Sequence, residues 1–252
     1  MTEQGHHSLA VGSATIAFRR TEGTSPGVLF CGGFKSDMTG SKATALEGWA
    51  REQGRAFVRF DYQGHGASSG RFADGTIGQW AEDARQVFDH CTSGPQVIVG
   101  SSMGAWIMLL VALSRPERVA GLVGIAPAPD FTEDLIWSTL GNDQRLELLD
   151  SGRLRLPSEY DEPTEITLQL IDEGRRHLLL RGKVPLSCPV RLIHGMSDID
   201  VPWVTSLRLS ERLASSDVRV VLVKDGDHRL SRDQDIALIC RTVADLTAAS
   251  PH

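Results

Sequence analysis

The chain has 252 residues, of which 41% are hydrophobic and 23% are charged, so it can bury a sizeable core. Its formal net charge of −6 argues against non-specific binding to nucleic acid and against electrostatic attachment to anionic membranes, because both require a basic surface. The longest apolar run, Ala105–Leu113, is shorter than the about 20 residues that cross a bilayer, so no membrane span is expected.

The N-terminus and the cysteines predict a cytoplasmic protein. The opening MTEQGHHSLAVGS has no basic region followed by an apolar region, as a secretory signal would. It contains Glu3 and no arginine before Arg19, which does not fit a transit peptide. The cysteines are far apart and form no C-x-x-C motif, so we expect reduced thiols and no zinc ribbon.

Short strand-like runs alternate with helix-length segments along most of the chain. The first such run, Ala14–Arg19, alternates in polarity and is expected to be an antiparallel edge strand. The other predicted strands are apolar: Val28–Phe30, Ala56–Phe60, Gln96–Val99, Val119–Ile125, Val190–Ile193 and Val218–Val223. The predicted helices are Lys42–Gln53, Ile77–His90, Gly104–Ser114, Thr205–Leu213 and Gln234–Thr247. This alternation indicates an α/β fold with a mostly parallel sheet flanked by helices.

The segment from Ala126 to Ser187 interrupts this alternation. It contains no convincing strand, only helix-like pieces joined by proline and glycine, namely Thr132–Leu140, Gln144–Leu149 and Thr164–Arg176. A structureless loop of this length is improbable in a compact domain. We therefore expect a single domain over residues 1–252 with a helical cap inserted at about 126–187.

The stretch Gly100-Ser101-Ser102-Met103-Gly104 matches the G-x-S-x-G motif only when Ser102 is its central residue. It follows a predicted strand and begins a predicted helix, which is the context of a nucleophile elbow. The residues two positions on either side must be small so that the strand and the helix can approach each other. Framing the motif on Ser101 would put bulky Val99 and Met103 there, so Ser102 is the expected nucleophile.

A serine nucleophile needs a base and an orienting carboxylate, which follow it in that fold in the order acid, then histidine. Asp198 follows the predicted strand Val190–Ile193, and His228 follows the last strand, so both lie at the carboxyl edge of the sheet. We favour Asp198 over the nearby loop carboxylate Asp200. His194, at a strand end, is expected to be structural.

The oxyanion hole needs two backbone N–H groups directed at the developing negative charge. Met103, directly after Ser102, and Phe34, in the loop that follows the Val28–Phe30 strand, are the expected donors. Trp106, Trp137 and Trp203 are candidates to line an acyl pocket, although each is also a plausible packing residue.

These motifs, together with RFDYQGHGASSG upstream, resemble the serine α/β-hydrolase superfamily over nearly the whole chain. A narrower resemblance is carried by GFKSDMTGSKA, VGSSMGAWIML, HGMSDIDVPW and DHR. These segments resemble the mitochondrial acyl-protein thioesterases of the α/β-hydrolase-domain series, also called mycophenolic acid acyl-glucuronide esterases. The family's triad would correspond to Ser102, Asp198 and His228.

The resemblance implies hydrolysis of S-acyl groups on proteins or of small acyl esters and thioesters, without a metal or organic cofactor. A broader carboxylesterase or acyl-glucuronide esterase is the alternative within this class. A non-catalytic ligand-binding hydrolase fold is the alternative outside it. The residues leave the acyl group and the oligomeric state open, and the absence of a presequence favours a cytoplasmic protein over a mitochondrial one.

Overall fold

The computed structural model describes residues 6–156 and 163–248. An eight-stranded sheet forms its centre, with the strand order β1-β2-β4-β3-β5-β6-β9-β10. The strands are β1 (His7–Val11), β2 (Ala14–Thr21), β3 (Thr24–Cys31), β4 (Arg55–Phe60), β5 (Gln96–Ser101), β6 (Val119–Ile125), β9 (Val190–Gly195) and β10 (Val218–Val223). From β4 to β10 all neighbours pair in parallel, which confirms the predicted α/β fold.

The predicted edge strand is only partly right. β2 does pair antiparallel with β4, but its other side is covered by β1, which pairs with it from His7↔Phe18 to Val11↔Ala14. β1 is therefore the edge strand at this end of the sheet. Its short sequence, HSLAV, carries too weak an alternation to be predicted as a strand on its own.

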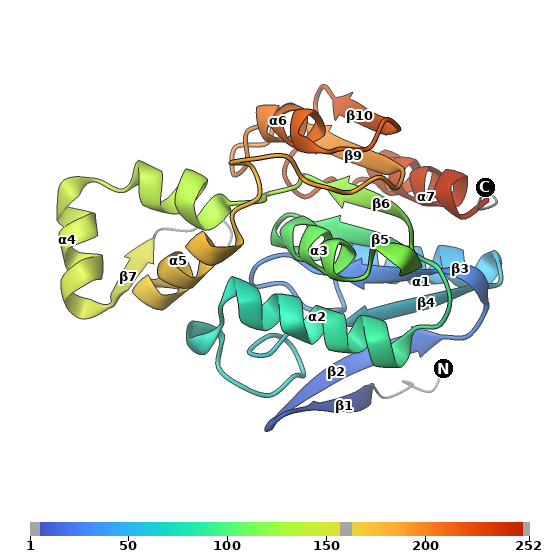
Figure 1. The fold of residues 1–252 in the computed structure, drawn as a ribbon, viewed down its shortest axis with the longest axis horizontal. Coiled ribbons are helices and arrows are strands. Elements are labelled where there is room, and N and C mark those ends of the chain that lie inside the picture. The colour runs from blue at the N-terminus through green and yellow to red at the C-terminus, as the bar shows by residue number, and fades with distance from the viewer. Residues whose placement is uncertain (1–5, 157–162, 249–252) are drawn as a thin grey trace.

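Helices cover both faces of the sheet, and each face has its own hydrophobic core (Figure 1). On one face α2 (Ile77–Cys91), α3 (Met103–Ser114) and α6 (Val204–Arg212) pack over Leu29 and Ile98. On the other face α1 (Ser41–Glu52) and α7 (Asp233–Ala248) pack over Val28 and Val97. Successive strand residues thus enter opposite cores, as the two-residue period of a strand requires.

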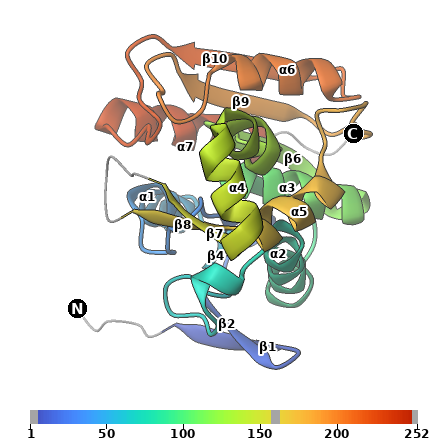
Figure 2. The same ribbon diagram turned by 90° about the vertical axis from the view of Figure 1, so that its left-hand side faces the viewer.

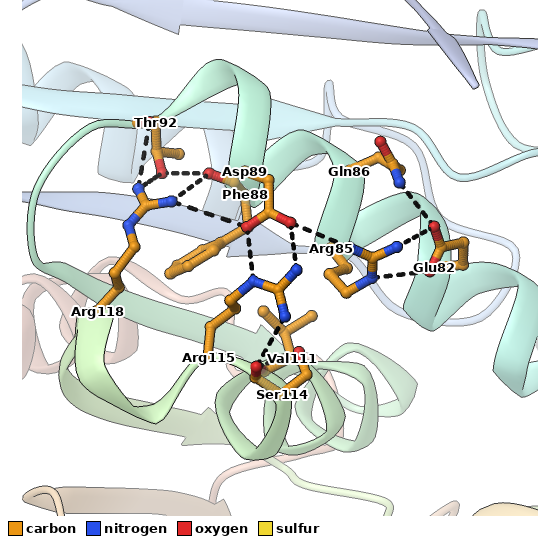
Figure 3. Close-up of polar contacts among 10 residues, drawn as sticks. All are labelled: Glu82, Arg85, Gln86, Phe88, Asp89, Thr92, Val111, Ser114, Arg115 and Arg118. Carbon is orange, nitrogen blue, oxygen red and sulfur yellow. Dashed lines mark hydrogen bonds and ion pairs between the residues drawn. The ribbon is translucent and has the colours of Figure 1, made fainter.

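An ion-pair network ties α2 to α3 (Figure 3). The Asp89 carboxylate of α2 accepts two hydrogen bonds from Arg115, at 3.0 and 2.8 Å, directly after α3. Arg85, one turn earlier on α2, donates to the same carboxylate at 3.1 Å. The network lies next to the start of β6, so it fixes the ends of the two helices that are remote from the carboxyl edge of the sheet.

The segment between β6 and β9 forms a cap, which projects to the left of the sheet in Figure 1 and lies in front of it, toward the viewer, in Figure 2. It contains the helical turns Thr132–Ile136 and Trp137–Thr139, then α4 (Asn142–Ser151), β7 (Arg153–Leu156), β8 (Thr164–Thr167), α5 (Leu168–Gly174) and the turn Arg175–His177. Within the described residues of this protein, no helix has the length and apolarity needed to cross a membrane.

The cap is helical in large part, as expected, but it also contains strands that were not expected, because β7 and β8 pair as an antiparallel hairpin from Arg153↔Thr167 to Leu156↔Thr164. The helix predicted over Thr164–Arg176 begins only at Leu168. The residues before it include β-branched Ile166 and Thr167, which favour strands, and the Thr167 hydroxyl accepts a hydrogen bond from the Leu170 N–H as a helix cap.

Polar contacts close the cap at its base and join it to α2. Asp130, at its beginning, has a fully buried carboxylate that accepts hydrogen bonds from the N–H groups of Leu179 and Leu180, at its end. Farther out, the Glu173 carboxylate of α5 accepts from the N–H of Gly78, in the first turn of α2. The cap is thus held both at its base and along α5.

Candidate active site

Ser102 occupies a strained turn between β5 and α3. Its backbone has φ +55° and ψ −120°, a left-handed conformation that few residues other than glycine adopt. A Cβ atom at Gly104 would lie 2.1 Å from the carbonyl oxygen of Cys31, and one at Gly100 would lie 2.4 Å from that of Gly104. The two flanking glycines are therefore required by close backbone contacts across the turn.

A chain of hydrogen bonds connects Ser102 to a buried acid. The Ser102 Oγ lies 3.1 Å from Nε2 of His228, and Nδ1 of the same ring lies 2.8 Å from Oδ2 of Asp198. The three side chains come from the turn after β5 and the loops after β9 and β10, so they meet at the carboxyl edge of the parallel strands. This arrangement of serine, imidazole and carboxylate is the geometry of a nucleophile activated by a general base.

The Asp198 carboxylate is fully buried and fully hydrogen-bonded. Its Oδ1 accepts from the backbone N–H groups of Asp200 and Val201, at 2.9 and 2.8 Å. Its Oδ2 accepts from His228 and from a second histidine, His194, whose Nε2 lies 3.1 Å away. Burial alone would raise the pKa of Asp198, but hydrogen bonds from His194 and His228 and the backbone hold that pKa well below its usual range. Asp198 therefore stays ionised near neutral pH.

Asp200, the alternative acid, is exposed, and its backbone N–H donates to Asp198. In the part of the chain that is described, Asp198, Asp200 and His228 form the one group of side chains whose ligand atoms lie close enough to hold a metal ion, within 4.8 Å of one another. Oδ2 of Asp198 and both ring nitrogens of His228 are already engaged by hydrogen bonds to protein atoms.

The two expected oxyanion donors flank Ser102. Met103 is the first residue of α3, where a helix N–H has no acceptor within the helix. A Cβ on Gly33 would lie 3.5 Å from the Cβ of Ser102, so the peptide that leads to Phe34 runs beside the serine. The Phe34 ring packs edge-on against Phe72, Trp80 and Phe131, which holds this loop in place.

A cavity of about 610 Å³ opens beside Ser102. Its apolar lining comes largely from the cap and includes Phe131, Leu135, Ile136, Leu156 and Ile166. Lys35, Lys42, Asp200 and Arg229 give the rest of the wall charge. The cavity therefore combines an apolar part under the cap with a charged part on the side of the sheet.

The proposed tryptophans are not among the residues that line this cavity. The Trp137 ring is covered by the guanidinium groups of Arg175 and Arg145, at 4.7 and 5.4 Å from its centroid. Trp203 lies at the beginning of α6. Trp106 is fully buried and donates a hydrogen bond from Nε1 to the carbonyl oxygen of His177.

Two functional candidates were not predicted from the sequence. His194 was expected to be structural, yet it shares Oδ2 of Asp198 with His228. Lys35 has φ +57° and donates from Nζ to the Thr164 hydroxyl of β8 at 3.3 Å, so it joins the loop beside Ser102 to the cap. No motif indicates either contact, because the first depends on how the loop after β9 folds back onto that strand and the second joins residues 129 positions apart.

The chain is similar to known hydrolases in both sequence and structure. The mitochondrial palmitoyl-protein thioesterase ABHD10 of Mus musculus is 42% identical, over 92% of this chain and 78% of that protein. A solved structure of mouse ABHD10 has a TM-score of 0.90 and 40% identity, over 96% of this chain and 98% of that one. A putative hydrolase of Agrobacterium vitis S4 has a TM-score of 0.92 and 41% identity, over 96% and 97% of the two chains.

The expectation of a cytoplasmic protein is wrong in the light of these relatives, because the matching ABHD10 proteins of mouse, rat and human are named mitochondrial. The N-terminal composition was too weak a basis for choosing a compartment.

Residues 27–148, which include most of β3, all of β5 and the Ser102 turn, match the hydrolase family described as serine aminopeptidase S33. With relatives more than 40% identical over nine tenths of its length, and with the same fold, the chain belongs to the ABHD10 family of α/β-hydrolases.

Proposed function

We propose that the protein hydrolyses acyl thioesters or esters by nucleophilic catalysis, with Ser102, His228 and Asp198 as the catalytic triad. The observation that carries this proposal is the position of His228, whose two ring nitrogens bridge the Ser102 hydroxyl and the buried Asp198 carboxylate. The names of the ABHD10 relatives, which describe palmitoyl-protein thioesterases, support the proposal that the substrate is an acyl thioester.

In the first half of the reaction, His228 Nε2 takes the proton of Ser102 as Oγ attacks the acyl carbonyl carbon. Asp198 holds the imidazole in the tautomer with its proton on Nδ1 and stabilises the imidazolium that forms. The N–H groups of Met103 and Phe34 accommodate the oxyanion. The thiol or alcohol then leaves with the proton from His228, and Ser102 is acylated.

In the second half, water takes the place of the leaving group. His228 removes a proton from the water as its oxygen attacks the acyl-enzyme carbonyl. The second tetrahedral intermediate collapses, the proton returns to Ser102, and the free acid leaves. The same three side chains and two N–H groups serve both halves.

The two parts of the cavity suggest how the substrate lies. Cap residues such as Phe131, Ile136 and Ile166 form an apolar wall suited to an acyl chain. Lys35, Asp200 and Arg229 form a charged wall suited to a polar leaving group in contact with water. We therefore propose that residues 126–187 act as the cap that selects the acyl chain.

A fluorophosphonate probe tests the triad, because it reacts covalently with an activated serine. We expect labelling of the wild type and none of Ser102→Ala. Ser101→Ala is the matched control, and it should still be labelled, because its hydroxyl makes no hydrogen bond to His228. Failure to label the wild type, or retained labelling of Ser102→Ala, would remove the basis of the proposal and favour a ligand-binding role.

The alternative substrate class consists of small carboxylic esters, including acyl glucuronides, whose polar leaving group also fits the charged wall of the cavity. A panel that pairs each acyl chain length with a thiol and with an alcohol separates the two classes. The thioesterase proposal predicts a higher kcat/KM for long-chain thioesters than for the alcohol esters of the same acyl chains. Much faster turnover of short alkyl esters than of any thioester would favour the carboxylesterase.

A further inference from the structure

Asp198 is bonded to two histidines rather than one. Its Oδ2 lies 2.8 Å from Nδ1 of His228 and 3.1 Å from Nε2 of His194. His194 is the penultimate residue of β9 and is fully buried, as is Ser206 of α6, whose hydroxyl lies 2.7 Å from Nδ1 of His194. The second histidine thus bonds the same oxygen of the acid as His228 does, and it connects that oxygen to α6.

The contacts of His194 define its tautomer. Nε2 faces two acceptors, Oδ2 of Asp198 at 3.1 Å and the carbonyl oxygen of Val201 at 3.0 Å, so this nitrogen carries a proton. Nδ1 faces the Ser206 hydroxyl, which can donate to it. The hydroxyl therefore stabilises the neutral tautomer whose only N–H is directed at the catalytic carboxylate.

We propose that His194 is a positioning residue for the proposed triad, and that Ser206, His194, Asp198, His228 and Ser102 form one continuous hydrogen-bonded relay. The inference rests on the proposed function, because it assigns a role relative to Asp198 and His228. His194 does not touch the substrate. It acts through the direction and the charge of the Asp198 carboxylate.

The first effect is geometric. A single N–H of His194 bonds both the Asp198 side chain and the Val201 carbonyl, while the Val201 N–H bonds Oδ1 of the same carboxylate. The loop from Asp198 to Val201 is thereby closed around the ring of His194. With both oxygens held, the carboxylate keeps Oδ2 directed at His228, as a preorganised site requires.

The second effect is electrostatic. A hydrogen bond from His194 withdraws negative charge from Oδ2, so the carboxylate attracts the proton of the His228 imidazolium less strongly. Without this bond the protonated imidazolium of His228 would be favoured. As the pH falls, the neutral imidazole that Ser102 needs as a base would then be lost at a higher pH. Asp200, within 4.8 Å of the same pair, is the other carboxylate that acts on this balance.

The experiment compares kcat, KM and the pH profile of kcat/KM in His194→Leu and His194→Gln, with active sites counted by fluorophosphonate titration. Leucine fills much of the ring's volume and donates nothing. Glutamine can place an amide N–H near the position of Nε2. For His194→Leu we expect a fall in kcat of roughly tenfold to a hundredfold, the range for one lost hydrogen bond to a charged group, with little change in KM. Its acidic limb should move to higher pH, and His194→Gln should restore most of both properties.

Ser206→Ala provides a second route, because it removes the hydroxyl that selects the tautomer but leaves the ring in place. We expect a smaller loss of kcat with a shift of the acidic limb in the same direction. Ser210→Ala, one turn later on α6, is the matched control, since its hydroxyl bonds only the Leu207 carbonyl among described residues. That variant should behave as the wild type does.

A measurement on the wild type makes the inference independent of the folding of any variant. The ¹⁵N shifts of labelled histidines distinguish the two tautomers, and His194 should carry its proton on Nε2. A proton on Nδ1 alone would overturn the inference, as would a wild-type kcat and pH profile in His194→Leu. Labelling that persists in Ser102→Ala would instead overturn the proposed triad itself, so the two failures are distinguishable.

Discussion

The sheet and the cap contribute to the same cavity by different physical means. On the side of the sheet, Ser102, Asp198 and His228 follow parallel strands, and their positions depend on backbone contacts too close for any additional atom. On the side of the cap, the lining consists of apolar side chains carried by short helical turns and a two-stranded hairpin. The apolar residues of the cap belong to the same hydrophobic core as α2 and α3, and the Asp130 carboxylate joins the two ends of the cap.

This difference predicts which substitutions should abolish the reaction and which should only change the range of substrates. Changes at the sheet edge should abolish folding or chemistry, because the close-packed turn has no room to relax. Changes in the cap should alter which acyl chain is accepted, with smaller effects on the reaction itself. Substitutions at Gly104, Asp130 and Ile136 test that division, in order of decreasing effect, and a substitution at Lys42 tests the charge of the cavity wall.

The largest effect is expected for Gly104→Ala. Its Cβ would lie 2.1 Å from the Cys31 carbonyl oxygen, so β3 and α3 must separate. We expect the free energy of unfolding to fall by about 3 kcal/mol or more, together with loss of fluorophosphonate labelling. Gly48→Ala in α1 is the control, because nothing lies within 4 Å of its new Cβ, and it should gain about 0.5–1 kcal/mol. Equal stability of the two variants in urea denaturation would contradict a rigid turn.

Asp130→Ala tests the attachment of the cap. The change leaves the buried N–H groups of Leu179 and Leu180 without their acceptor, which should lower the free energy of unfolding by about 2–4 kcal/mol. Labelling of Ser102 by a small fluorophosphonate should persist, while KM for long-chain substrates should rise. Asp150→Ala, exposed on α4, is the matched control. If Asp130→Ala abolished labelling, the cap and the sheet edge would not be separable.

Ile136→Ala tests the selection of the acyl chain. Ile136 is a partly buried residue of the cap that lines the cavity. Its truncation should lower kcat/KM for long acyl chains by roughly tenfold, the value of about one to two methylene contacts, and leave short-chain substrates nearly unchanged. Leu149→Ala, 55% exposed on α4, should change neither. A uniform loss across all chain lengths would assign Ile136 to the chemistry rather than to selection.

The smallest effect concerns Lys42 of α1, at the edge of the cavity. Burial lowers the pKa of this lysine to about 8, against the opposing attraction of Asp227. The unfolded chain binds its proton more tightly, so the lysine destabilises the fold below pH 8, and this cost disappears as the pH rises from about 8 toward 10.5. Lys42→Met should therefore be more stable than the wild type at pH 7, although it loses the Lys42 hydrogen bond to the Arg229 carbonyl, and its advantage should shrink with rising pH.

Chemical denaturation at pH 7 and at pH 10 measures this change. Lys183→Met is the control, because Lys183 is exposed and its replacement should show no such dependence. A pH-independent gain in Lys42→Met would mean that packing rather than charge accounts for it.

The central strands of the sheet could be predicted from the sequence because they are buried on both faces, as β5 is along its whole length. Its run Val97–Val99 is continuous in apolar residues, and the glycines around Ser102 mark the turn. The cap could not be predicted equally well. The β7–β8 hairpin depends on pairing between Arg153–Leu156 and Thr164–Thr167, and neither run alternates strongly enough to be recognised alone.

The candidate site divides in the same way. The order of Ser102, Asp198 and His228 can be read along the chain, since each follows a strand. The second bond of Asp198 to His194 cannot, because it depends on how the loop after β9 folds back onto that strand. Trp137 was expected near the substrate on the strength of its residue type, and its contacts with Arg145 and Arg175 involve residues up to 38 positions apart (175 − 137).

Asp130 has a consequence for how this protein family can diversify. Because one carboxylate joins the beginning of the cap to its end, the two connecting peptides are held side by side whatever lies between them. The 48 residues between Asp130 and Leu179 can then lengthen, shorten or recombine without moving the strands that carry the reacting groups. Because the cap is closed at its base, its sequence can change while the strands that carry Ser102, Asp198 and His228 stay in place. New substrate ranges can arise in this way.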